Sequence, residues 1–318
     1  ANSGIAGNYI LALEQDNKGN IWMGTWGDGI SILDPKTGRF RNMRQEPGKA
    51  NSLSGNNIYA LAKTDHTMWI GTFGAGLNAY DTKTRTFSSF QHDPGNPNSL
   101  SSNLVSSLMA DKKGGLWIGT FDEGLNYFNT KTKSFTHYRK GTTDKDLSDN
   151  SITSIIEARN GIIWVTTFAG LHRLDPKTGK VKMYDTAQGL AHNYTQAVVE
   201  DDRGILWVST NAGLSKFDPK KGTFRNYSTE NGLQVGEFKA KSALKSSTGT
   251  LFFGGINGFN EFRPTAISTK PYNVPVMLTR FQIANKDVPV ARNENDLSPL
   301  KTEISETKHI ELSYKQSF

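Results

Sequence analysis

Aromatic, acidic and amide side chains gather in six short segments that recur through the chain. These segments are residues 26–29, 73–76, 121–124, 168–170, 211–213 and 256–258, and four of the six begin with an aromatic residue. An aromatic ring stacks on the apolar face of a sugar, and carboxylates and amides bond to its hydroxyls. We therefore expect recognition of a polyhydroxylated ligand, although each aromatic residue taken singly is explained more readily as core packing. Candidate residues in and beside these segments are Trp26, Asp28, Phe73, Phe121, Asp122, Glu123, Phe168, His192, Tyr194, Asn211, Glu237 and Asn257.

Catalytic chemistry has little support in the sequence. The chain has no cysteine, and its six histidines show no metal-ligand spacing with one another or with a pair of carboxylates. We find no nucleophile elbow and no glycine-rich phosphate loop. His192, Tyr194 and Glu237 are the best candidates for an active site, but we predict no enzyme activity, no metal and no cofactor for this region.

A recurring tetrapeptide places the six segments. Trp-Ile-Gly-Thr, or a relative of it, begins at residues 22, 69, 117, 164, 207 and 252, so that the spacing is 43 to 48 residues. Each candidate segment starts directly after one copy. A fixed period of this length is typical of repeat proteins whose units share one continuous core.

Each repeat predicts a set of short antiparallel strands. In the third copy the expected strands are residues 104–111, 116–121, 125–129 and 134–139, separated by turns rich in Gly, Asp and Lys. Four strands in about 45 residues are typical of a propeller blade. The predicted fold class is all-β: a β-propeller of four-stranded antiparallel blades with six visible repeats, of which the sixth shows three clear strands. This fold would bring every candidate segment to one face.

The repeated motifs themselves have structural explanations. The Trp of the tetrapeptide is expected to pack between neighbouring blades, and the Gly two residues later leaves room for the next sheet. A second signature, such as Leu53-Ser54-Gly55-Asn56, precedes each blade. We expect its Asn and Ser to satisfy turn backbone rather than to bind a ligand.

The net charge of +7 lies mainly away from the candidate segments. Solvated turns explain most of this charge. The sequence has no interleaving of arginine with aromatic residues that would indicate a nucleic-acid site, and the charge is only weak support for an acidic ligand. No apolar run reaches the roughly 18 residues that a membrane span requires. The turns expected on the opposite face carry Lys18, Lys36, Arg39, Lys83, Arg85, Lys112, Lys113, Lys131, Lys133, Lys177, Lys180, Arg203, Lys220 and Lys221.

The repeat pattern ends near Arg263, and three prolines follow. We expect residues 1–268 to form the propeller, as part of a longer array. Residues 269–318 are predicted to be a linker and an incomplete immunoglobulin-like β domain, with strands at 276–283 and 310–314 and a polar loop at 293–306. Because the chain begins at Ala1 rather than Met, we expect it to be a piece of a longer protein.

The combination of Trp69-Ile70-Gly71-Thr72, Gly76-Leu77 and Asp81-Thr82-Lys83-Thr84 resembles the two-component regulator propeller repeat. The resemblance covers residues 3 to 263, although the copies at 164–167 and 207–210 lack the Gly and the sixth lacks the Trp. Residues 276–281 and 310–314 look like the start of the triple-tyrosine module that follows such propellers. The resemblance implies the periplasmic sensor part of an inner-membrane regulator, commonly a hybrid histidine kinase that senses an oligosaccharide to control polysaccharide-utilisation genes.

The resemblance also implies the partners. We expect an oligosaccharide ligand, which includes acidic oligosaccharides. We also expect a homodimer in the full-length receptor and membrane attachment only through segments outside this chain. No nucleic-acid partner is expected. Two alternatives remain open: a protein-interaction propeller, and a propeller lyase or hydrolase with its site at the centre of the candidate face.

Overall fold

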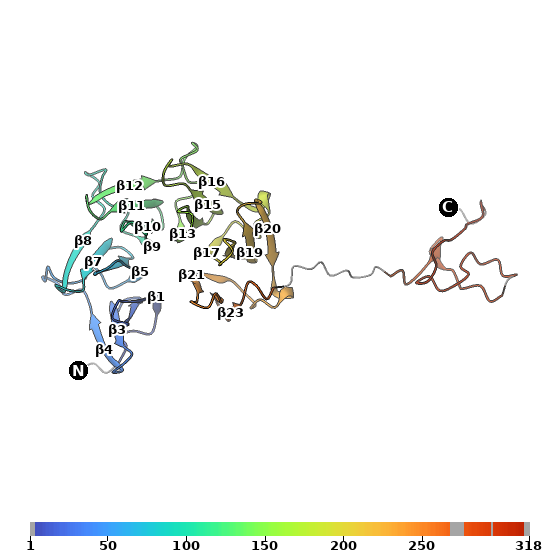
Figure 1. Cartoon of the computed structure of the whole chain (residues 1–318), viewed down its shortest axis with the longest axis horizontal. Coiled ribbons are helices and arrows are strands. Elements are labelled where there is room, and N and C mark those ends of the chain that lie inside the picture. The colour runs from blue at the N-terminus through green and yellow to red at the C-terminus, as the bar shows by residue number, and fades with distance from the viewer. Residues whose placement is uncertain (1–3, 268–276, 294, 315–318) are drawn as a thin grey trace. The chain divides into compact units, whose positions relative to one another are not determined.

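The computed structural model describes residues 4–267, 277–293 and 295–314. Contacts divide the chain into two compact units, Ala1–Ala266 and Ile267–Phe318. The first unit is a ring of six antiparallel sheets, so the predicted all-β propeller is confirmed (Figure 1). Among the described residues, no helix has the length and apolar character to cross a membrane.

Each sheet, or blade, is built from consecutive strands in chain order. Blade 1 contains β1 (Ile10–Gln15), β2 (Ile21–Thr25), β3 (Ile30–Asp34) and β4 (Arg39–Met43). Blade 2 contains β5 (Ile58–Lys63), β6 (Thr67–Thr72), β7 (Leu77–Asp81) and β8 (Thr86–Phe90). Blade 3 contains β9 (Val105–Ala110), β10 (Leu116–Thr120), β11 (Leu125–Asn129) and β12 (Ser134–Tyr138).

The second half of the ring continues this pattern. Blade 4 contains β13 (Ile152–Glu157), β14 (Ile163–Thr167), β15 (Leu171–Leu174) and β16 (Val181–Tyr184). Blade 5 contains β17 (Thr195–Glu200), β18 (Leu206–Thr210), β19 (Gly213–Asp218) and β20 (Thr223–Tyr227). Blade 6 has three strands, as expected: β21 (Phe238–Lys245), β22 (Leu251–Gly255) and β23 (Gly258–Phe262). Short 3₁₀ helices, η1 (Thr186–Gln188) and η2 (Thr229–Asn231), follow β16 and β20.

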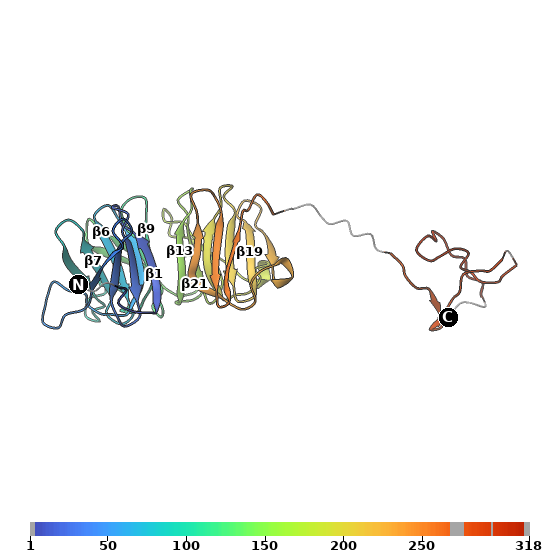
Figure 2. The same ribbon diagram turned by 90° about the horizontal axis from the view of Figure 1, so that it is seen from below.

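The first strand of every blade is the innermost. The strands β1, β5, β9, β13, β17 and β21 pack against one another in that order around the ring. Figure 2 shows the strands of this unit running between two faces. The turn between the second and third strands of each blade lies on one of these faces, which we call the upper face. The opposite face is the lower face.

The repeated Trp residues pack the blades together, as the sequence predicts. All five, from Trp22 to Trp207, are at most 3% exposed. Four of them contact an aromatic ring on the third strand of the following blade, with ring centroids 4.8 to 5.8 Å apart. These pairs are Trp22–Tyr80, Trp69–Phe128, Trp164–Phe217 and Trp207–Phe262.

The Gly of the tetrapeptide allows this close approach. A Cβ atom placed on Gly71 would lie 2.5 Å from Cγ1 of Val105, on the first strand of the next blade. Gly24 and Gly119 would meet an isoleucine of the next blade at 2.6 Å in the same way. Carbon atoms need about 3.5 Å, so any larger residue would force neighbouring blades apart.

The second signature is structural as well. Oδ1 of Asn56 accepts a hydrogen bond from the backbone N–H of Gln45 at 2.8 Å, and Asn103 and Asn150 make the equivalent bonds. These bonds hold the chain where it leaves one blade for the next. The expected role in turn backbone is therefore confirmed for these three residues.

The seam between blades 1 and 6 differs from the other five. Leu13 of β1 is 65% exposed, whereas Leu61 and Ile155 at the same position of blades 2 and 4 are buried. Leu244 of β21 is 61% exposed, whereas Ala62 at the same position is buried. The two apolar faces at the ends of the ring therefore do not pack as the inner seams do.

The second unit shows little regular structure in its described residues. It has one two-stranded hairpin, β24 (Gln282–Ile283) and β25 (Lys286–Asp287), and a small apolar centre with Leu300 and Ile304. Of the strand expected at 276–283, only Gln282 and Ile283 are in a strand, residues 277–281 are not, and residue 276 lies outside the described range. No strand is formed at 310–314. The expected start of an immunoglobulin-like domain is not confirmed.

Candidate ligand-binding face

Three of the aromatic residues predicted as candidates meet on the upper face. The ring centroids of Trp26 and Phe73 are 5.3 Å apart, and those of Phe73 and Phe121 are also 5.3 Å apart. Trp26 is 43% and Phe73 37% exposed. Blades 1, 2 and 3 thus present a continuous aromatic surface to solvent.

Tyr59 joins this surface, although the sequence analysis did not select it. Its ring centroid lies 4.8 Å from that of Phe121. The register of β5 with β6 passes from Ile58 opposite Thr72 to Ala60 opposite Gly71, so Tyr59 is the extra residue of a β-bulge. Every complete blade has this bulge, at Leu11, Tyr59, Ser106, Thr153 and Gln196. The signal was available in the sequence, because each of these residues follows the first residue of an inner strand.

Lys241 of blade 6 is the second residue that sequence reasoning missed. The bulge of β21 is longer than the others, covering residues 239–242, and it holds Lys241 at a φ of 60°. This left-handed conformation is uncommon for a residue other than glycine. The ammonium lies 3.7 Å from the ring centroid of Tyr59 and donates a hydrogen bond to the Tyr59 carbonyl.

Lys241 stands apart from the ion pairs that the described residues form. No ion pair to it occurs among the described residues. The side chain as a whole is half-buried, and its ammonium end is the part withdrawn from water. This burial lowers the pKa of Lys241 well below the usual lysine range. An anion placed beside it would offset that penalty.

Blades 4 and 5 carry a separate aromatic pair. Phe168 stacks on Tyr194 with centroids 4.8 Å apart and ring planes 24° apart, and His192 lies 5.8 Å from Tyr194. Asn211 accepts a hydrogen bond from Nε2 of Gln196 at 2.7 Å. The aromatic candidates therefore form two groups, one on blades 1–3 and one on blades 4 and 5, and Glu237 and Asn257 lie on blade 6.

The acidic and amide candidates are divided between paired and open groups. Asp28 pairs with Arg44, and Glu123 pairs with Arg139 at 3.3 Å. The Asn257 side-chain amide donates to the Val235 carbonyl at 2.7 Å, within its own blade. Asp122 and Glu237 are exposed, and neither forms an ion pair within the described part of the chain.

The structure does not assemble a catalytic group from His192, Tyr194 and Glu237. Nδ1 of His192 accepts a hydrogen bond from the Tyr194 backbone N–H at 3.0 Å, which is a local turn contact. The backbone carbonyl of Glu237 accepts hydrogen bonds from the Ile256 N–H at 3.0 Å and from Nε2 of Gln234 at 3.4 Å, so these contacts do not involve its carboxylate. In the described residues no cluster of three or more His, Asp or Glu side chains is arranged to hold a metal ion.

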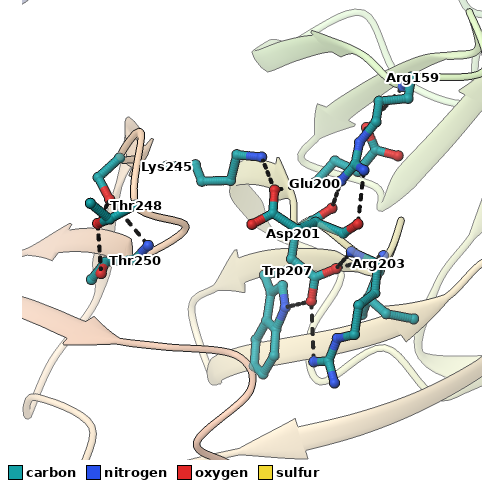
Figure 3. A network of polar contacts seen from close by, with 11 residues as sticks. Arg159, Glu200, Asp201, Arg203, Trp207, Lys245, Thr248 and Thr250 are labelled. Carbon is teal, nitrogen blue, oxygen red and sulfur yellow. Dashed lines mark hydrogen bonds and ion pairs between the residues drawn. The ribbon is translucent and has the colours of Figure 1, made fainter.

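The lower face carries charged turns joined by ion pairs across the blades. Figure 3 shows Arg159 of blade 4 pairing with Glu200 of blade 5 at 3.8 Å. Lys245 of blade 6 reaches Asp202 of blade 5 at 2.8 Å. These exposed pairs each contribute little to stability. They neutralise part of the positive charge expected on this face.

Comparison with known proteins agrees with the repeat architecture. Five segments match the family model of the two-component regulator propeller, at residues 4–27, 52–74, 99–122, 146–169 and 189–212. Each match covers the inter-blade signature, the inner strand and the tetrapeptide. "Histidine kinase P4" of Formosa agariphila is 30% identical over 168 residues, which are 53% of this chain and 9% of that protein.

Solved structures show the same fold. The extracellular domain of a hybrid two-component system from B. thetaiotaomicron is 27% identical with a TM-score of 0.71, over 83% of this chain and 34% of that one. The extracellular domain of a one-component system from the same organism is 21% identical with a TM-score of 0.63, over 98% of this chain and 41% of that one. Virginiamycin B lyase from Staphylococcus aureus has a TM-score of 0.58 at 14% identity, over 82% of this chain and 85% of that one. The last two likenesses concern the fold alone, and this chain spans about a third of the first structure.

Proposed function

The chain carries two-component regulator propeller repeats, and from this premise we propose that it is a ligand-sensing region whose ligand is an oligosaccharide. We place it in the periplasm, as part of an inner-membrane receptor that acts as a homodimer and controls polysaccharide-utilisation genes. The likeness to the extracellular domain of a hybrid two-component system supports this placement. In this proposal the region itself has no catalytic role.

The observation that carries the proposal is the aromatic surface of Trp26, Phe73, Phe121 and Tyr59. Exposing large rings to water is unfavourable, yet Trp26 and Phe73 are exposed side by side, and the partly exposed rings of Phe121 and Tyr59 continue the surface. Such a surface stacks well on the apolar faces of successive sugar rings. The open carboxylate of Asp122, adjacent in sequence to Phe121, supplies an acceptor for hydroxyl groups.

Lys241 sharpens the class of ligand. Its ammonium lies over Tyr59, at the edge of the aromatic surface, without a carboxylate partner among the described residues. A carboxylate on the ligand would provide that partner and form a charge-assisted hydrogen bond. We therefore propose an acidic oligosaccharide, such as one containing uronic acid.

Isothermal titration calorimetry with neutral and uronic-acid oligosaccharides tests the proposal. We expect Trp26→Ala and Phe121→Ala each to weaken binding about 10-fold. Lys241→Met should weaken acidic ligands about 10- to 100-fold and leave neutral ones little changed. Lys221→Met on the lower face removes the same charge and serves as the matched control.

Three results would contradict the proposal. If no glycan of either kind binds, the sensing of oligosaccharides is wrong. If binding is unaffected by Trp26→Ala and Phe121→Ala, the site lies elsewhere. Formation of product from a bound glycan would show that the region is an enzyme.

A further inference from the structure

The seam between blades 3 and 4 lacks the aromatic filling of its neighbours. In blades 2, 3 and 5 the third and fourth strands each supply one ring to the preceding seam, for example Phe128 with Phe135, whose centroids are 4.6 Å apart. Blade 4 has Leu174 and Val181 at these two positions. The side chain of Trp117 therefore has no aromatic partner on the following blade in the described structure.

Beside Trp117, the same seam has a cavity open to the lower face, between turns of blades 3 and 4. Its volume is about 340 Å³. Trp117, Tyr127 and Tyr138 of blade 3 form its aromatic wall, with ring centroids 4.8 Å (Trp117–Tyr127) and 5.7 Å (Trp117–Tyr138) apart. A cavity of this size lies within the range of about 300–1,000 Å³ in which proteins bind small molecules.

Every other inner seam places a cation of the chain over its aromatic rings. Lys133 lies 5.8 Å from the ring centroid of Phe128, and Lys182 lies 4.9 Å from that of Tyr184. Arg41 lies over Tyr80 in the first seam, and Arg225 lies over Tyr227 in the fifth. Among the described residues, the rings of the seam between blades 3 and 4 have no such cation.

The sequence explains this exception. The strand pair β11–β12 places Tyr127 opposite Thr136, whereas the equivalent pair of blade 5 places Lys216 opposite Arg225. Lys216 and Arg225 both lie over aromatic rings of their seam. Blade 3 thus replaces two cations by a tyrosine and a threonine, which leaves its aromatic wall uncovered.

Carboxylates lie inside the cavity and lysines at its rim. Asp111 and Glu157 are half-buried lining residues. The Glu157 side chain is only 13% exposed, and its carboxylate pairs with the exposed ammonium of Lys112 at 3.9 Å. Burial, and then the neighbouring Asp111 carboxylate, raise the pKa of Tyr127. Lys113 and Lys177 also line the cavity but are exposed, so their ammonium groups remain hydrated.

We propose that this cavity binds a small organic cation, with its ammonium group over Trp117, Tyr127 and Tyr138. An aromatic wall attracts a cation through the negative face of each ring, and Asp111 and Glu157 add charge of the right sign. The ligand takes the place that a lysine or arginine of the chain occupies in the other seams. The cavity lies on the lower face, so this proposal does not depend on the sugar site proposed for the upper face.

The test uses choline and its uncharged analogue 3,3-dimethyl-1-butanol, which have nearly the same shape. Calorimetric titration of the chain should show choline binding about 10-fold more tightly than the analogue. Equal binding of the two, or no binding of choline at the highest soluble concentration, would overturn the proposal.

Two variants restore features of the other blades and locate the site. Thr136→Lys places a cation where blade 4 has Lys182, and Leu174→Phe restores the missing ring. Both should abolish choline binding while the melting temperature is kept or raised, because each makes the seam resemble its neighbours. Leu33→Phe makes the same substitution at the equivalent position of blade 1 and should leave binding unchanged. Choline binding that survives both Thr136→Lys and Leu174→Phe would show that the cation binds elsewhere.

Discussion

Replacing His172 by asparagine should remove a pH-dependent weakness from blade 4. In blades 2 and 3 the second residue of the third strand is Asn78 or Asn126, and each accepts a hydrogen bond from the backbone of the inter-blade signature. In blade 4 His172 does the same: its Nε2 accepts from the Ser148 N–H at 3.2 Å. An acceptor nitrogen cannot carry a proton, so the structure requires a neutral imidazole.

The size of the effect follows from the pKa of His172. The residue is fully buried, and burial lowers its pKa from 6.5 to about 4, with Asp149 offsetting part of the change. The unfolded chain therefore binds a proton more readily than the folded one. The stabilising contribution is complete above pH 6.5 and is lost as the pH falls toward 4. Linkage predicts a loss of about 2 kcal/mol between pH 7.5 and pH 5, and about 3 kcal/mol below pH 4.

Urea unfolding followed by tryptophan fluorescence, at pH 7.5 and pH 5, measures this difference. At pH 7.5 we expect the free energy of unfolding of His172→Asn to be within about 1 kcal/mol of that of the parent, because asparagine already occupies the equivalent position in two blades. At pH 5 the variant should gain about 2 kcal/mol relative to the parent. Other groups titrate equally in both proteins and cancel in the comparison. If the free energies of unfolding of the two proteins differ by the same amount at pH 7.5 and pH 5, the reasoning is refuted.

Two further predictions concern the packing of the blades. Gly71→Ala should cost about 1–3 kcal/mol, because the new methyl group would overlap Val105, and Val105→Ala in the same chain should recover most of the loss in urea unfolding; a double variant no better than the single one would contradict this. Leu61→Glu should lower the melting temperature sharply, whereas Leu13→Glu at the exposed end of the ring should change stability by at most about 0.5 kcal/mol. Equal shifts would show that the end seam is closed.

Most of the propeller could be predicted because its signals are local and repeated. The tetrapeptide combines strand periodicity, a buried Trp and a Gly that is required by the next blade, and each copy is independent support for the others. The same logic failed for the tail. Residues 310–314 have apolar alternation typical of a strand, but strands need a partner sheet, and the described residues of this unit provide only one short hairpin.

The candidate site was only partly predictable. The hairpin aromatics follow the tetrapeptide at a fixed distance, so Trp26, Phe73 and Phe121 could be selected from spacing alone. Tyr59 and Lys241 lie in β-bulges, of one extra residue in β5 and of residues 239–242 in β21. The position of Tyr59 recurs in every complete blade, but strand alternation alone does not indicate that a bulge turns its side chain to the upper face. The contact between Tyr59 and Lys241 joins residues of blades 2 and 6, and no sequence period indicates which blades face each other across the ring.

Departures from a repeat do not all indicate function, and the structure separates two kinds. His172 differs from Asn78 but accepts the same backbone hydrogen bond, so the inter-blade signature keeps its partner, although Nδ1 of His172 is buried without one among the described residues. Among the described residues Lys241 has no ion-pair partner, and blade 4 supplies no ring to Trp117, which lines a cavity. An unpaired charge and an unfilled cavity both cost stability unless something binds there. Since a repeat offers a stable alternative at every position, uncompensated departures are the places where a ligand should be sought first.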